Sequence, residues 1–157
     1  MILFIRLSNW VESKKIIPEW QAGFRESRDT LDHIFTLNAL MNANLRNKGG
    51  KLYTLAVDLK SAFPSVPHNL LWIKLNKIGI SHKIINIIRD LYNKASMTVK
   101  TKDVMTDNCS ITRCVLQGET LSPLLYSLYI SDLGKYLTDE GIRGVQLDDK
   151  TATFSIC

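Results

Sequence analysis

The strongest constraint on this chain is an apolar run that ends on an acid. Residues 51–58 read Lys-Leu-Tyr-Thr-Leu-Ala-Val-Asp, so Asp58 follows a mainly apolar stretch that contains β-branched residues. Short runs of this kind are typical of buried strands, and we expect a strand that carries Asp58 to the rim of a sheet. A carboxylate in that position is costly unless it meets a cation or hydrogen-bond donors.

Length and composition predict one globular domain over residues 1–157. With 45% hydrophobic residues the chain has enough apolar side chains for a core, and its formal charge of +5 favours a phosphate-bearing partner. Three cysteines form no paired framework, so we expect an intracellular setting, in the cytoplasm or the nucleus. The apolar stretches are too short for a signal peptide or a membrane span, and we expect no membrane partner.

The remaining sequence predicts helices around one hairpin, which makes the fold class α+β. Alternation over residues 96–100 and 109–113 predicts the hairpin. Asp29 and Ser81 are expected N-caps, and Gly79 is an expected helix stop. Apolar residues at helical spacing predict helices over residues 2–15, 29–48, 67–78, 81–92 and 122–137.

Two more segments accompany the apolar run: Gln21-Ala22-Gly23-Phe24-Arg25 and Gln117-Gly118-Glu119-Thr120-Leu121-Ser122-Pro123. With residues 51–63 they resemble the reverse transcriptases of non-LTR (LINE-type) retrotransposons, in that family's order and spacing, over nearly the whole chain. The resemblance implies a polymerase fingers-palm fragment with a small antiparallel sheet packed by helices. Residues 1–50 would be fingers-like, and residues 51–157 mostly palm-like with some fingers elements.

The resemblance implies a metal site and a nucleotide site. Asp58 and the backbone carbonyl of Leu59 would bind Mg²⁺, or Mn²⁺, for two-metal nucleotidyl transfer; the alternative is an Asp that caps the turn after the strand. Phe63 would lie under the sugar of the incoming deoxynucleoside triphosphate and exclude a 2′-hydroxyl; the alternative is an ordinary core Phe. Pro64 stands where relatives commonly have Asp, which changes the local backbone.

The second motif carries the other nucleotide contacts. Gln117 and Gly118 would lie against the nucleotide and the template base, whereas a Gln-Gly pair taken alone indicates a surface turn. Ser122 and Pro123 suit the N-cap and first turn of the following helix, so we give them a positioning role. Cys114 and Leu116 stand where relatives usually have Gly and a basic or Pro residue.

Basic residues predict contacts with the RNA template and the DNA primer. By resemblance Arg25, with Arg28 beside it, would face phosphates from the fingers. Lys100 on the hairpin could follow a nucleic-acid backbone. A solvated, charged surface explains any one of these residues equally well.

The family also needs an adjacent Asp pair in a Tyr-Ala-Asp-Asp hairpin that follows the stretch matched by residues 141–147. Asp148 and Asp149 are adjacent, but Leu147 and Lys150 flank them and no Tyr-Ala precedes them. We therefore expect the 157-residue chain to be inactive by itself as an RNA-directed DNA polymerase. The alternatives are a non-catalytic nucleic-acid-binding remnant and a plain folded relic.

Overall fold

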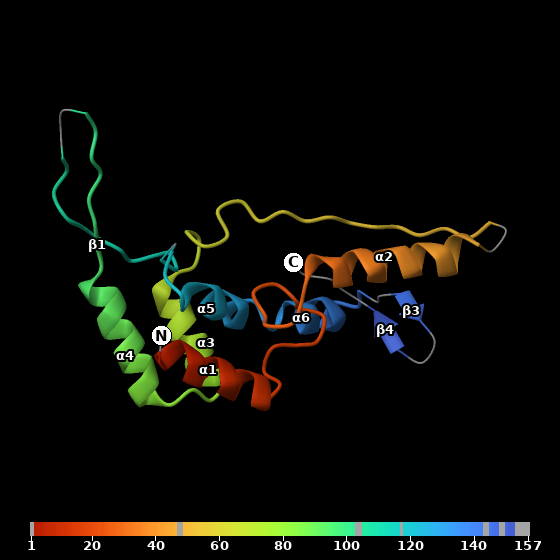
Figure 1. Ribbon diagram of the computed structural model, residues 1–157, viewed down its shortest axis with the longest axis horizontal. Coiled ribbons are helices and arrows are strands. Elements are labelled where there is room, and N and C mark those ends of the chain that lie inside the picture. The colour runs from red at the N-terminus through yellow and green to blue at the C-terminus, as the bar shows by residue number, and fades with distance from the viewer. Residues whose placement is uncertain are drawn as a thin grey trace. The chain divides into compact units, whose positions relative to one another are not determined.

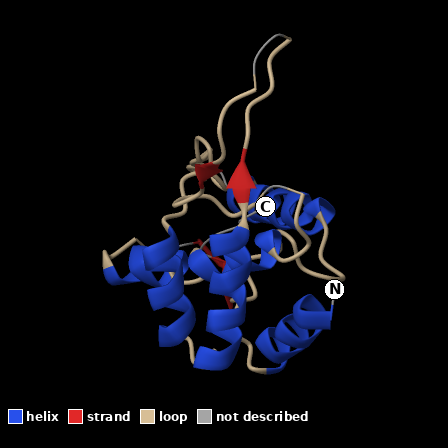
Figure 2. Cartoon of the chain, turned by 90° about the vertical axis from the view of Figure 1, so that its left-hand side faces the viewer, coloured by secondary structure: helices blue, strands red, loops and turns tan. Residues whose placement is uncertain are grey.

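The computed structural model describes residues 2–46, 49–102, 105–116, 118–142, 145–147 and 150–152. The chain divides into two compact units, one of Met1–Leu59 with Ile130–Cys157 and one of Lys60–Tyr129. Helices make up most of the regular structure, with little strand (Figures 1 and 2). The division into fingers-like and palm-like parts at residue 50 stays a prediction.

The first unit contains helices α1 (Ile2–Ser13), α2 (Thr30–Leu45) and α6 (Leu133–Asp139). Its strands β3 (Val145–Leu147) and β4 (Lys150–Ala152) pair in antiparallel fashion. The predicted N-cap of α2 is confirmed, because Asp29 and Asp32 form a capping box. The Asp29 carboxylate accepts from the Asp32 N–H, and the Asp32 carboxylate accepts from the Asp29 N–H. Helix α2 buries none of its residues, and its apolar side chains at Leu31, Ile34, Phe35 and Met41 are exposed.

The predicted strand over residues 51–58 is wrong. These residues form no strand in the structure, and Figure 1 draws them as an extended coil after α2. Tyr53 and Leu55 are each 86% exposed and Val57 is 71% exposed, so the expected burial is absent as well. A strand requires backbone partners, and no described segment pairs with this one.

The second unit contains α3 (His68–Lys77), α4 (His82–Lys94) and α5 (Ser122–Tyr129). Helix α3 packs against both α4 and α5. Gly79, at a φ of +90°, follows α3 as predicted, because only glycine adopts this conformation without strain. The side chains that are almost completely buried in this unit include Val66, Leu71, Leu75, Ile88, Tyr92, Val115, Leu125 and Leu128.

The predicted hairpin is confirmed. Strand β1 (Ser96–Met97) pairs with β2 (Cys109–Ser110) in antiparallel fashion, and an isolated bridge joins Lys100 to Met105 farther along the arm. Figure 2 shows this arm extending well beyond the helices of its own unit.

The predicted long helix over residues 122–137 is two helices. Helix α5 ends at Tyr129 and α6 begins at Leu133. Between them the N–H of Leu133 donates to the carbonyl of Ile130 at 3.0 Å and closes a turn. Ser131 and Asp132 occupy this turn, and their short polar side chains favour turns and caps over helix interiors.

None of the helices among the described residues is both long enough and apolar enough to cross a membrane.

Gly134 of α6 lies close against the Trp20 ring in the first unit. A Cβ placed there would lie 2.5 Å from Cζ2 and 2.7 Å from Cε2 of the Trp20 ring. We predict that Gly134→Ala lowers the free energy of unfolding by about 1–2 kcal/mol, because overpacking a rigid ring outweighs the gain in helix propensity. Chemical denaturation measures it, with the exposed substitution Lys135→Ala as control. Equal stability of the two variants would show that Trp20 does not pack on α6.

Candidate functional site

A hollow of about 420 Å³ in the second unit brings Phe63, the last residue of the first motif, together with the second motif. Four residues expected to form the site line it: Phe63, Gly118, Ser122 and Pro123. Among the described residues, Leu116, Glu119 and Thr120 line it as well. Segments far apart in the sequence therefore meet in one concave surface, which is the form that small-molecule sites usually take.

Backbone hydrogen bonds hold the turn that carries Phe63 against the segment that leads into the second motif. The N–H of Val115 donates to the carbonyl of Phe63 at 3.0 Å, and the N–H of Cys114 donates to the carbonyl of Val66 at 2.9 Å. An isolated antiparallel bridge between Pro67 and Arg113 continues this pairing. The turn that carries Phe63 is thus fixed relative to the segment that leads into Gly118.

One lining residue of the hollow, Phe63, belongs to an aromatic pair. The ring of Phe63 is half-buried and stacks on Tyr126 of α5, with the ring centroids 4.9 Å apart and the planes at 24°. Tyr126 is buried, and burial raises the pKa of its hydroxyl. The stacking fixes the plane of the Phe63 ring, which can then present one face to a ligand.

Gly118 leaves open space in the lining. Its φ is +87°, and a Cβ placed there would meet no atom within 4 Å. The positive φ requires glycine, and the open space lets a ligand approach the backbone closely. The neighbouring Gln117, also a predicted nucleotide contact, lies outside the described residues.

Polar groups that the sequence analysis did not select lie beside the hollow. Ser122 Oγ donates to Glu119 Oε2 at 3.4 Å, and the buried Tyr92 hydroxyl lies 3.4 Å from the same Oγ. Burial raises the pKa of Tyr92. Glu119 precedes Ser122 by three residues, so one motif contains both groups; Tyr92 comes from α4, and no local signal identifies it. Ser122 is the first residue of α5, one position inside the predicted N-cap, and its positioning role stays a prediction.

Asp58 and Leu59 belong to the first unit, whereas Phe63 and the hollow belong to the second. The Asp58 carboxylate and the Leu59 carbonyl are hard oxygen donors, the type that Mg²⁺ prefers. Their number does not complete a site, because within the described part of the chain no three His, Cys, Asp or Glu side chains gather around a common point. The donor type fits the metal and the donor set does not, so we derive no metal-dependent step. Asp148 and Asp149 lie outside the described residues.

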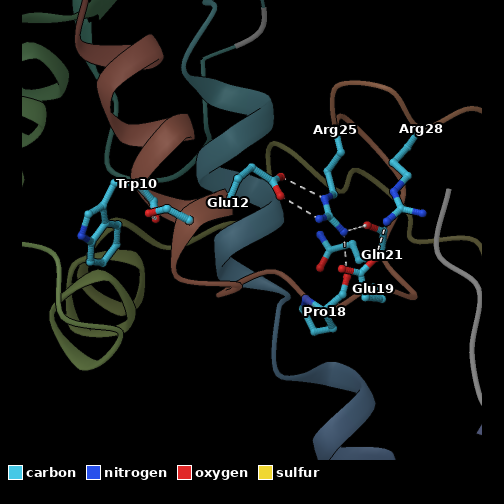
Figure 3. A network of polar contacts seen from close by, with 8 residues as sticks. Trp10, Glu12, Pro18, Glu19, Gln21, Arg25 and Arg28 are labelled. Carbon is cyan, nitrogen blue, oxygen red and sulfur yellow. Dashed lines mark hydrogen bonds and ion pairs between the residues drawn. The ribbon is translucent and has the colours of Figure 1, made fainter.

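Arg25 is the centre of a polar network within the first unit (Figure 3). Its Nε and Nη2 donate to the two carboxylate oxygens of Glu12 at 3.0 and 2.8 Å. Its Nη1 donates to the carbonyls of Pro18 and Gln21 at 3.0 and 3.1 Å. The side chain is only 7% exposed, so Arg25 cross-links the loop to α1, and its predicted phosphate contact stays a prediction.

The other predicted phosphate contacts are more exposed. Arg28 pairs through Nη2 with Glu19, and its side chain is 38% exposed against 7% for Arg25. Lys100 is exposed on the hairpin. Lys94 at the end of α4, Lys102 and Arg113 are exposed as well. These groups are accessible to a nucleic-acid backbone.

Comparison with known proteins identifies the family. Residues 2–153 match the family described as reverse transcriptase (RNA-dependent DNA polymerase), and the chain belongs to this family. The resemblance seen in the motifs is thereby confirmed.

The similar proteins come from mobile elements. The chain is 27% identical over 130 residues to a probable RNA-directed DNA polymerase from transposon BS of Drosophila melanogaster, and 26% identical over 134 residues to one from transposon X-element of the same species. These matches cover 82% and 84% of this chain. A retrovirus-related Pol polyprotein from the type-1 retrotransposable element R2 of Popillia japonica is 28% identical over 97 residues, 61% of this chain.

The chain spans 14% of the length of each of the two Drosophila relatives and 16% of the R2 protein. It corresponds to part of the reverse transcriptase domain of a non-LTR mobile element.

Cys114 departs from the family pattern at a position where the backbone conformation is strained. Its φ is +101°, a region that side chains rarely adopt, at the position where the resemblance leads one to expect glycine. We predict that Cys114→Gly raises the free energy of unfolding by about 0.5–2 kcal/mol, because relief of strain exceeds the entropic cost of glycine. Cys114→Ala keeps the Cβ and should give no gain in denaturation experiments. An equal effect of the two substitutions would place the cause in the thiol and not in the backbone.

The Arg25 network predicts a pH dependence. The hydrogen bond from Arg25 lowers the pKa of Glu12, so this pair stabilises the fold above the ordinary glutamate range and loses its effect as the pH falls through the lowered pKa. Glu12 is 44% exposed, and solvent screening limits the pair to about 1 kcal/mol or less. Denaturation between neutral and acid pH should show a smaller acid loss in Glu12→Gln than in the parent chain.

Two matched substitutions separate the buried arginine from the exposed one. Arg25→Ala should cost about 1–3 kcal/mol at neutral pH, because it removes the donors to the Glu12 carboxylate and the Gln21 carbonyl and one of the two donors to the Pro18 carbonyl. Arg28→Ala should cost less than about 1 kcal/mol. Similar losses in both variants would contradict the role given to Arg25.

Proposed function

We propose that this chain forms the nucleotide-facing part of an RNA-directed DNA polymerase encoded by a mobile element. The observation that carries the proposal is the hollow in which Phe63, Gly118, Ser122 and Pro123 meet. Membership of the reverse transcriptase family supports the reaction class, and the names of the similar proteins support the mobile-element origin.

The substrate proposed for the hollow is a deoxynucleoside triphosphate. The Phe63 ring, held by Tyr126, would lie against the sugar and leave no room for a 2′-hydroxyl. Gly118 would allow the nucleotide to approach the backbone, with Gln117 beside it. Ser122 and Pro123 would position this loop at the start of α5.

The proposed cofactor is Mg²⁺, with Mn²⁺ as a substitute. Asp58 and the carbonyl of Leu59 would contribute ligands in the whole polymerase, which must supply the remaining ligands. A divalent ion held there in the whole polymerase would supply positive charge opposite the triphosphate. The proposed macromolecular partners are the RNA template and the DNA primer, with phosphate contacts from Lys100, Arg28 and, if its network opens, Arg25.

Sugar selection by Phe63 tests the proposal on the 157-residue chain. We predict that dCTP displaces a fluorescent deoxynucleoside triphosphate, labelled on the γ-phosphate, more readily than CTP does. Phe63→Val should shrink this preference by about tenfold, because the smaller side chain opens space under the sugar. Competition titrations in Mg²⁺ followed by fluorescence anisotropy measure the ratio of the two dissociation constants.

Phe35→Val is the matched control, because Phe35 lies on α2 and is 75% exposed. It should leave the dCTP to CTP ratio unchanged. Equal affinity of the parent chain for dCTP and CTP, or a preference that survives Phe63→Val, would refute the assignment of Phe63.

A further inference from the structure

His68 makes a direct hydrogen bond to the segment that leads into the hollow. Its Nε2 lies 2.8 Å from the carbonyl oxygen of Cys114. A carbonyl oxygen only accepts, so the proton must be on Nε2. The N–H of His68 also donates to the carbonyl of Thr112 at 3.4 Å. His68 therefore ties the first residue of α3 to residues 112–114 through both its backbone and its side chain.

Aromatic neighbours fix the orientation of the His68 ring. It lies edge-on to Tyr92, with the centroids 5.1 Å apart and the planes at 80°. Trp72, one turn along α3, lies 5.8 Å from His68 and 5.7 Å from Tyr92. Three rings from α3 and α4 thus restrict one another, and edge-to-face packing of this kind is favourable.

Tyr92 reaches the same segment at Ser122. Tyr92 is 1% exposed, and its hydroxyl lies 3.4 Å from Ser122 Oγ. Ser122 lines the hollow, so this buried hydroxyl contacts the end of the loop that contains Gly118.

Cys114, whose carbonyl accepts the hydrogen bond from His68, has a strained backbone conformation. Cys114 has a φ of +101°, and such conformations persist only where the surrounding structure imposes them. Its N–H is held by Val66 at 2.9 Å and its carbonyl by His68 at 2.8 Å. Without the His68 bond, one of the two backbone contacts that hold this conformation would be lost.

We propose that His68 and Tyr92 are positioning residues that hold residues 114–122 in the shape that brings Gly118 and Ser122 opposite Phe63. His68 fixes the start of the loop at Cys114, and Tyr92 fixes its end at Ser122. Neither residue lines the hollow, so both act through the loop. The significance of this arrangement for nucleotide binding rests on the function proposed above, whereas its effect on the loop does not.

Amide hydrogen exchange by NMR on the 157-residue chain tests the proposal. His68→Phe keeps an aromatic ring against Tyr92 and Trp72 but removes the donor. It should speed exchange of the Cys114 and Val115 amides about tenfold and leave the Leu71 and Leu75 amides of α3 unchanged. His68→Gln places an amide donor near the former Nε2 and should restore most of the protection. His82→Phe, at the exposed start of α4, should change neither group.

Nucleotide binding adds a separate readout. If the hollow binds deoxynucleoside triphosphates, His68→Phe and Tyr92→Phe should each weaken dCTP binding several-fold, and His68→Gln should recover it. If the parent chain binds no nucleotide, the proposed function fails, and the exchange data still decide whether the loop is held by His68.

Unchanged Cys114 and Val115 exchange in His68→Phe would overturn the proposal, as would failure of His68→Gln to restore protection. If His68→Phe does not fold, the parent chain itself decides the matter. Its His68 imidazole must show a slowly exchanging Nε2 proton coupled to the Cys114 carbonyl, and a ring protonated on Nδ1 alone would overturn the proposal.

Discussion

The hollow depends on two backbone hydrogen bonds, from Cys114 N–H to the Val66 carbonyl and from Val115 N–H to the Phe63 carbonyl. They join the turn that carries Phe63 to the segment that leads into Gly118, and they fix the position of each relative to the other. Loops carry function well only when a scaffold holds them. Here the scaffold is α3, α4 and α5, whose buried side chains support both segments.

In the first unit, Arg25 holds a loop against helix α1. One guanidinium group satisfies the Glu12 carboxylate and two loop carbonyls, and the rigid fork of arginine suits this pattern of acceptors (Figure 3). A residue that resembles a phosphate ligand in sequence is therefore also a structural cross-link. Phosphate binding by Arg25 would have to compete with all of these contacts, whereas Arg28 would have to release only the Glu19 carboxylate.

Local signals predicted local structure well. The Asp29 cap, the Gly79 stop and the alternation that forms the hairpin each depend on neighbouring residues, and all three are confirmed. The strand over residues 51–58 failed because pairing depends on a partner elsewhere in the chain, which apolar spacing cannot reveal. The long helix over residues 122–137 failed for the opposite reason: its apolar spacing continues through Ser131 and Asp132, but their local turn preference prevails.

The candidate site shows the same contrast. Phe63, Gly118, Ser122 and Pro123 were selected through a family resemblance, and the structure brings them together. His68 and Tyr92 could not be selected in this way, because their contacts with Cys114 and Ser122 join separate elements and leave no spacing pattern in the sequence. Glu119 and Thr120 belong to the second motif, so the sequence could have predicted that they line the hollow.

One NMR titration tests the central claim most directly. Addition of dCTP and Mg²⁺ to the 157-residue chain should shift the amide signals of Phe63, Gly118, Thr120 and Ser122, because a nucleotide in the hollow would contact these residues. The amides of α2 should not move. Shifts confined to the loop around Arg25 and Arg28, or no shifts at saturating nucleotide, would contradict the claim that the two motifs form one nucleotide site.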